Sequence, residues 1–215
     1  MNYNSLARLA TFYQQLVKVS VEDTKTILSQ LSQLEHFKDR IEYAEKHTEH
    51  LSSGSARIIY KLPDGQVLKL AKNKKGLAQN KVESDPGMKS KYINPTIFAD
   101  KQGYWRVAPF LEKINEKDFE QMTGIDFKQF GDALRYGLRD LSNGEHEKPN
   151  NFERIAKTEL YQDLVRLSKT FRVLPGDLAR ISSYGTNGKH PVVLDMGLTR
   201  EIYDTYYDDS DSSST

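Results

Sequence analysis

Val192-Val193-Leu194-Asp195-Met196-Gly197-Leu198 is an apolar run that carries a single carboxylate into a Met-Gly turn. A short apolar run bounded by turn residues is typical of a buried strand. The pattern therefore predicts a strand that ends in an aspartate able to bind a metal ion. An aspartate that only initiates a turn after the strand is the simpler interpretation.

Two upstream segments carry charged residues that suit the same chemistry. Asp177 follows the short run Leu174-Pro175-Gly176, and Lys69 lies inside the hydrophobic segment Val67–Ala71. Burying an ammonium group is unfavourable unless an anion meets it, so Lys69 needs a nucleotide phosphate or a fixed glutamate as its partner. Phosphoryl transfer uses a lysine on the phosphates, a carboxylate on magnesium and a carboxylate toward the acceptor hydroxyl. A lysine that snorkels to solvent and an aspartate that caps a turn are the simpler alternatives.

Composition limits the class of protein. A chain of 215 residues with 37% hydrophobic residues fits one domain, or two small lobes that share an interface. The formal net charge of +1 argues against a dedicated nucleic-acid binder. No cysteine is present, which excludes disulfides and thiolate metal sites. No signal peptide or membrane span is recognisable, so we expect a cytoplasmic protein.

Residues 1–50 are predicted to form a helical extension. Apolar side chains recur at helical spacing along one stripe, and Ser20 with Asp23 matches a capping box that opens a second helix with its own stripe. The first stripe runs through Leu6, Leu9, Tyr13 and Leu16, and the second through Ile27, Leu31, Leu34 and Ile41. We expect one stripe to pack on the domain and part of the other to mediate self-association or to bind a protein partner.

The rest of the chain divides into three parts. Residues 51–112 predict two hairpins, the first with the turn Pro63-Asp64-Gly65 and the second with its turn at residues 100–103. After Glu112 the strand patterns stop, and residues 113–206 predict two long helices separated by a polar loop at residues 142–151. Residues 207–215 are predicted to be a disordered acidic Ser/Asp tail.

This order of elements resembles the protein-kinase-like fold over roughly residues 51–206. The resemblance implies an α+β, two-lobed architecture with a small antiparallel β lobe and a helical lobe, truncated after the Asp-x-Gly motif at Asp195 and preceded by a helical extension. Small proteins of tailed bacteriophages carry a similar Lys-Leu-Ala-x-Asn-x-x-Gly segment, here residues 69–76, and a similar Asp-x-Gly-Leu-Thr, here residues 195–199. Resemblance to these proteins implies a location in the cytoplasm of an infected host cell or in the virion.

The resemblance also implies a site for ATP and Mg²⁺. Asp177 matches the catalytic-loop aspartate and Asp195 the metal ligand, while Glu83, on a short helix around residues 76–84, matches the glutamate that orients the lysine. The residues implied to bind the nucleotide are Gly54, Ile59, Val67, Lys69, Glu83, Phe110 and Leu111, of which Gly54 belongs to the phosphate-covering loop and the last two to the hinge.

Two departures from the family pattern leave two functions open. Ser182 stands where kinases have a metal-binding asparagine, and the substrate-docking helices that normally follow the Asp-x-Gly motif are missing. The first function is a minimal kinase-like nucleotide-binding protein that transfers phosphate from Mg-ATP to a protein or to itself. The alternative is a non-catalytic pseudokinase that serves as an interaction or virion-associated protein. Neither function implies a nucleic-acid or membrane partner, and an oligomer is compatible with both.

Overall fold

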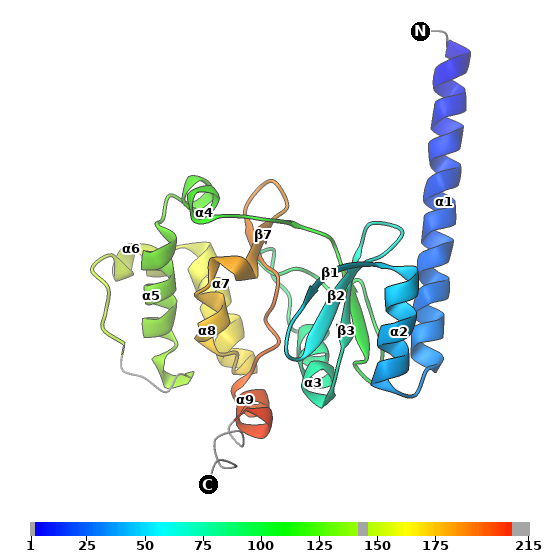
Figure 1. Ribbon diagram of the computed structural model, residues 1–215. Coiled ribbons are helices and arrows are strands. Elements are labelled where there is room, and N and C mark those ends of the chain that lie inside the picture. The colour runs from blue at the N-terminus through cyan, green and yellow to red at the C-terminus, as the bar shows by residue number, and fades with distance from the viewer. Residues whose placement is uncertain (1–2, 142–145, 208–215) are drawn as a thin grey trace.

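The computed structural model describes residues 3–141 and 146–207, with side chains from Tyr13 onward except that of Leu16. It combines an antiparallel sheet with helices, so the α+β class is confirmed. One lobe holds a five-stranded sheet with α1 and α2 beside it, and the other holds most of the remaining helices (Figure 1). No helix within the described ranges is long and apolar enough to cross a membrane. Of the predicted tail, residues 208–215 lie outside the described residues, whereas Tyr207 stacks on Tyr203.

The N-terminal extension is one long helix followed by a short one. Helix α1 spans Tyr3–Gln33 and α2 spans Phe37–His47, so the helix start predicted at Ser20 is wrong. Ser20 Oγ donates within the helix to the carbonyl of Val17 (2.9 Å) instead of capping a new one. The chain turns after Gln33, where the buried Arg40 donates to the carbonyls of Leu31 (3.0 Å) and Glu35 (3.2 Å). These bonds satisfy acceptors that a helix end leaves open.

The second half of α1 packs on the body of the protein. Ile27, Leu28 and Leu31 are buried in the core of the sheet lobe, which confirms the predicted packing of that stripe. The first half projects away from the sheet (Figure 1). The side chains of Val17 and Val19, on that half, are exposed. Leu6, Leu9 and Leu16 of the other stripe lie outside the residues whose side chains are described, and its role in self-association or partner binding stays a prediction.

The five-stranded sheet has the strand order β1-β2-β3-β5-β4, with antiparallel neighbours throughout. Both predicted hairpins are confirmed. The first is β2 (Arg57–Lys61) with β3 (Val67–Ala71), and the second is β4 (Phe98–Ala99) with β5 (Trp105–Ala108). Strand β1 (Glu49–Ser53) was not predicted and spans the predicted boundary between the helical extension and the first hairpin. Its five residues are all exposed, so no alternation of apolar and polar side chains marks it.

Helix α3 (Lys74–Glu83) crosses beside β3 and confirms the short helix predicted there. Asn73 caps it, since the Asn73 side chain accepts from the N–H of Gly76 (3.2 Å). The cap fixes where the helix starts and therefore where its last residue, Glu83, lies relative to the sheet.

The second lobe contains the remaining elements. Its helices are α4 (Glu116–Thr123), α5 (Phe127–Gly137), α6 (Phe152–Ala156), α7 (Glu159–Phe171), α8 (Pro175–Leu178) and α9 (Arg200–Tyr206), with single 3₁₀ turns at Arg139–Leu141 and Ile181–Ser183. Helices α5 and α7 confirm the two predicted from periodicity. A second antiparallel sheet has the order β6 (Glu112–Lys113), β7 (Tyr184–Thr186) and β8 (Pro191–Val193). Strand β8 confirms the strand predicted before Asp195, whereas β6 and β7 lie where no strand was predicted. These strands of two or three residues are too short to show a period.

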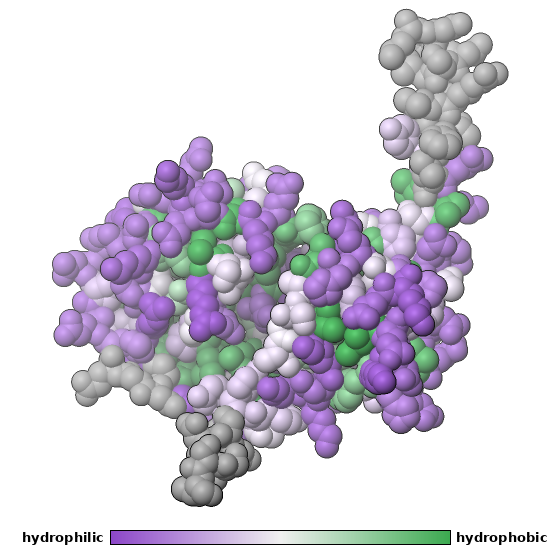
Figure 2. All heavy atoms as spheres, viewed as in Figure 1, coloured by the Kyte–Doolittle hydropathy of each residue, from purple (hydrophilic) through white to green (hydrophobic). Residues whose placement is uncertain are grey.

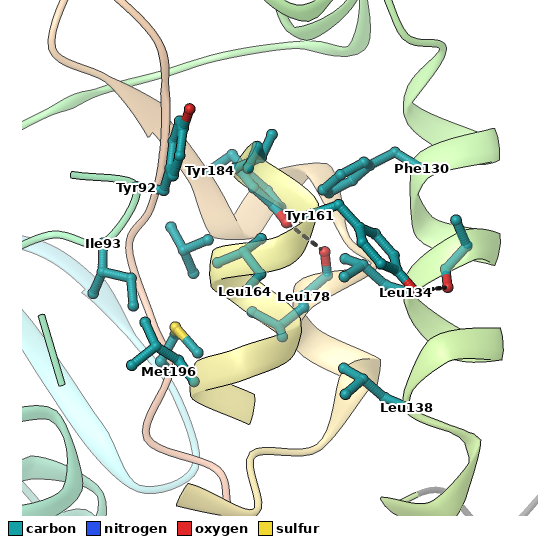
Figure 3. Close-up of a cluster of buried hydrophobic side chains, with 14 of the residues drawn as sticks. Tyr92, Ile93, Phe130, Leu134, Leu138, Tyr161, Leu164, Leu178, Tyr184 and Met196 are labelled. Atoms are coloured by element: carbon teal, nitrogen blue, oxygen red, sulfur yellow. Dashed lines mark hydrogen bonds between the residues drawn. The ribbon is translucent and has the colours of Figure 1, made fainter. Parts of the chain in front are cut away.

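The second lobe has its own core, formed between α5, α7 and the chain around β7 and β8 (Figure 3). Tyr184 is fully buried and its hydroxyl donates to the carbonyl of Leu178 (2.8 Å), while burial raises the pKa of the Tyr184 phenol. Met196 is buried in the same core. The residue after Asp195 is thereby anchored, which holds the Asp-Met-Gly turn in place. Hydrophilic side chains cover most of the visible face of the molecule (Figure 2).

Candidate functional site

A cleft of about 410 Å³ lies where the five-stranded sheet meets Leu194 and Asp195, the residues that follow β8. A volume of this size is in the range of small-molecule sites. Most of its wall is apolar, and Lys69 and Asp195 are among its polar residues. The lining residues are Leu51, Ser52, Ile59, Val67, Lys69, Asn94, Pro109, Phe110, Leu111, Lys113, Ser182, Ser183, Leu194 and Asp195.

Lys69 enters the cleft from the middle of β3, where both neighbouring strands cover the backbone. Its Nζ donates to Glu83 Oε2 (2.7 Å) and to the carbonyl of Leu194 (2.5 Å). The pairing of Lys69 with Glu83 that the sequence implied is therefore confirmed. Burial lowers the pKa of Lys69, the charge of Asp195 opposes that shift, and the neighbouring guanidinium groups add to it.

Glu83 is the centre of a buried charge cluster, which we define as Arg57, Lys69, Glu83, Arg106 and Asp195. Its carboxylate accepts from all three cations, including Arg57 Nη1 (2.9 Å) and Arg106 Nη1. Burial, with the charge of Arg57, lowers the pKa of Arg106 to about 9, so this guanidinium remains protonated at neutral pH. At formal charges three cations thus face two carboxylates, which is a formal excess of one positive charge, while burial acts against it by lowering the pKa of Lys69.

Arg57 and Arg106 were not predicted as site residues, although their positions in the sheet indicate a shared anionic partner. Arg106 lies directly across from Lys69 in the pairing of β3 with β5, so the two side chains share one face of the sheet. Arg57 is the first residue of β2, a strand that is otherwise mainly apolar. Cations inside short apolar strands on one face of a sheet indicate a shared anion.

Asp195 follows β8 and reaches the charge cluster from the other lobe. Its Oδ2 lies 2.6 Å from Arg57 Nη2, and its Oδ1 accepts from the N–H of Gly197 (3.2 Å). Although burial acts to raise it, the charges of Arg57 and Lys69 hold the pKa of Asp195 well below its ordinary value. The Asp195 side chain is nevertheless 46% exposed, so a ligand in the cleft can reach it.

The glycine of the Asp-Met-Gly turn is required by the close approach of α3. A Cβ at Gly197 would lie 2.8 Å from the Cβ of Gln79 and 3.0 Å from Glu83 Oε1. The turn also donates from the N–H of Met196 to Glu83 Oε1 (3.3 Å). Glu83 therefore connects both lobes to Lys69.

The other predicted site residues divide into two groups. Ile59, Val67, Phe110 and Leu111 line the cleft as expected. Gly54 does not line it: it lies in the turn between β1 and β2, where its N–H donates to the carbonyl of Arg57 (2.8 Å). Leu51 and Ser52 of β1 line the cleft at that side.

Asp177 is on α8 and lines a neighbouring cavity instead of the cleft. Its Oδ1 accepts from Arg180 Nη1 (3.1 Å). Burial and the charge of Asp195 raise the pKa of Asp177 above its ordinary value. The charge of Asp195 thus affects the pKa of Asp177, but the structure does not bring Asp177 into the same cleft as Lys69.

We expect an Asp177→Asn variant to be more stable than the wild type at neutral pH. A carboxyl whose pKa is raised on folding costs stability when it is ionised, and that cost disappears as the pH falls below the ordinary pKa of aspartate. The gain in melting temperature should therefore be present at pH 7 and vanish toward pH 3. Asp163→Asn is the matched control, because its pKa is lowered, against the effect of burial, by Ser90 and Arg166, and its loss should destabilise. Unchanged or reduced stability of Asp177→Asn at pH 7 would contradict a raised pKa of Asp177 in the folded protein.

The residues around Asp195 do not form a dedicated magnesium site. Mg²⁺ prefers carboxylate oxygens in octahedral geometry, but both oxygens of Asp195 already have donors in Arg57 and Gly197. Within residues 3–141 and 146–207, no group of three or more acidic, histidine or cysteine side chains is placed to hold a metal ion. Ser182, at the position of the kinase asparagine, lines the cleft with only a hydroxyl to offer.

No protein-family model and no curated protein matches this sequence. Among solved structures, the chain is similar to a choline/ethanolamine kinase family protein from Mesorhizobium loti, with 14% sequence identity and a TM-score of 0.34. The match covers 70% of this chain and 57% of that one.

Proposed function

We propose that this chain is a protein-kinase-like nucleotide-binding protein, with a purine nucleotide in the cleft between its two lobes. The observation that carries the proposal is the Lys69–Glu83 ion pair at a mostly apolar cleft that Asp195 also lines. An excess positive charge in a buried cluster is unfavourable alone and favours an anionic ligand. The apolar part of the cleft suits a flat base.

The two ends of the cleft suggest how the nucleotide lies. Ile59 and Val67 come from the sheet and Leu194 from the other lobe, so a base placed between them contacts aliphatic side chains on both faces. Phe110 and Leu111 line the cleft in the segment that joins the lobes. The phosphates then extend toward Lys69, which lines the cleft and belongs to the charge cluster.

Calorimetric titration with ATP, ADP and GTP tests this proposal. A Lys69→Met variant should weaken binding by at least tenfold, or about 1.4 kcal/mol, while the fold remains because Glu83 keeps two arginine partners. Lys148→Met is the matched control, since Lys148 pairs with Glu153 on the second lobe, away from the cleft. Absence of binding to the folded wild type at millimolar nucleotide, or equal affinities for both variants, would overturn the proposal.

Between the two functions left open by the sequence, the positions of Asp177 and Asp195 favour a non-catalytic pseudokinase. Phosphoryl transfer needs the acceptor held about 3–3.5 Å from the reacting atom, beside the carboxylate that takes its proton. Asp177 instead lines a different cavity and pairs with Arg180. Incubation with labelled ATP followed by mass spectrometry decides the question. Phosphorylation of this chain or of added protein that is lost in Asp177→Asn would establish a phosphotransferase and reject the pseudokinase.

A further inference from the structure

We propose that Arg57 takes the place of a metal ion at Asp195, so that the nucleotide binds without a divalent cation. This inference rests on the proposed nucleotide site and concerns how the negative charge of Asp195 is neutralised there. The observation is the short ion pair between Arg57 Nη2 and Asp195 Oδ2 (2.6 Å), made by an arginine whose side chain is 5% exposed. A carboxylate at the phosphate side of the cleft is thereby neutralised by the protein itself.

Several bonds fix Arg57 at this position. Its Nη1 donates to Glu83 Oε1 (2.9 Å) and to Asn80 Oδ1 (3.3 Å), both on α3. Asn80 is in turn held by bonds from its Nδ2 to the carbonyls of Lys69 (3.2 Å) and Gly103 (3.0 Å). A guanidinium whose Nη1 is held by two acceptors on α3 directs its Nη2 toward Asp195 in a set geometry. Arg57 is therefore a buried, hydrogen-bonded residue of the site and not a mobile surface cation.

The charge balance explains why a metal ion would not be needed. An unpaired Asp195 carboxylate near a polyphosphate would repel it, by a few kcal/mol per charge pair at about 4 Å in a medium of effective dielectric constant near 20. A divalent cation relieves this repulsion in a site with a free carboxylate. Here the guanidinium of Arg57 already neutralises the carboxylate of Asp195. The formal positive charge in excess within the cluster can then attract the phosphates.

The test compares ATP binding in the presence of a chelator with binding in the presence of magnesium, by calorimetry on the full chain. We expect the wild-type dissociation constants in the two buffers to agree within about threefold, which is less than 1 kcal/mol. In Arg57→Gln the carboxylate is released, so affinity in chelator should fall about tenfold or more and magnesium should restore much of it. Arg166→Gln, which removes an exposed partner of Asp163 on α7, is the control and should behave like the wild type.

Asp195→Asn tests the same proposal if Arg57→Gln fails to fold. It removes the carboxylate without changing its shape, so binding in chelator should stay equal or become tighter. Wild-type binding that requires magnesium, or that is lost in Asp195→Asn, would overturn the inference and leave the proposed nucleotide site standing. Absence of ATP binding in both buffers would overturn the nucleotide site and this inference together.

Discussion

Replacing Glu83 by alanine should lower the free energy of unfolding by about 3–5 kcal/mol, the range for removing one partner from a buried ion pair. The Glu83 side chain is 3% exposed and accepts from Arg57, Lys69 and Arg106. Without it, three buried cations would face only Asp195. Because domains are stable by about 5–15 kcal/mol, much of the total would be lost.

Urea denaturation followed by tryptophan fluorescence measures this effect. The chain has one tryptophan, Trp105, which is buried in the core of the sheet lobe and so reports on the lobe that carries Lys69. Glu159→Ala is the matched control: Glu159 pairs with Lys91, but both side chains are at least half exposed, and surface pairs contribute little. A Glu83→Ala midpoint close to that of Glu159→Ala would contradict a central role for Glu83.

A double variant shows whether the loss comes from uncompensated charge. Adding Lys69→Met to Glu83→Ala removes one of the cations left without a partner, so the double variant should be more stable than Glu83→Ala alone. If the two substitutions destabilise additively, the loss reflects packing around Glu83 and not charge.

The sequence predicted those parts of the site that depend on local pattern. Lys69 inside an apolar strand and Asp195 behind another are both visible from neighbouring residues, and the structure brings them to one cleft. Glu83 was implied by the resemblance to the kinase-like fold, and it meets the need of a buried lysine for an anion. For Lys69 and Asp195 the charged residue type conflicts with its apolar surroundings, and that conflict is visible in a sequence.

What could not be predicted depends on contacts between distant segments. Arg57 reaches Asp195 across the two lobes, and this contact leaves no periodic pattern in the sequence. Asp177 pairs locally with Arg180, three residues on, but its position outside the cleft depends on how the second lobe packs. The capping box at Ser20 failed for a related reason. Its two residues fit a helix start, but a helix already in progress satisfies the backbone, and the serine bonds within it instead.

The largest effect should come from removing the N-terminal helix in two steps. Deleting residues 1–22 should leave the unfolding midpoint nearly unchanged, because the described side chains of that segment are exposed or half-exposed. Deleting residues 1–33 also removes Ile27, Leu28 and Leu31, each fully or almost fully buried. Such side chains contribute about 1.5–3 kcal/mol each, so their summed loss is comparable to the whole stability of a domain.

The longer deletion should therefore prevent the sheet lobe from folding, while the helical lobe, which has a separate core, keeps part of its helical signal. Trp105 fluorescence and far-ultraviolet circular dichroism separate the two lobes, since Trp105 donates to Ser32 Oγ (3.1 Å) and loses this partner in the longer deletion. The single substitutions Leu31→Ala and Val17→Ala repeat the comparison without truncation. Leu31 is fully buried and should lose about 2–5 kcal/mol, whereas Val17 is exposed and should lose almost nothing. A 1–33 deletion that melts like the wild type would show that α1 is not part of the small-lobe core.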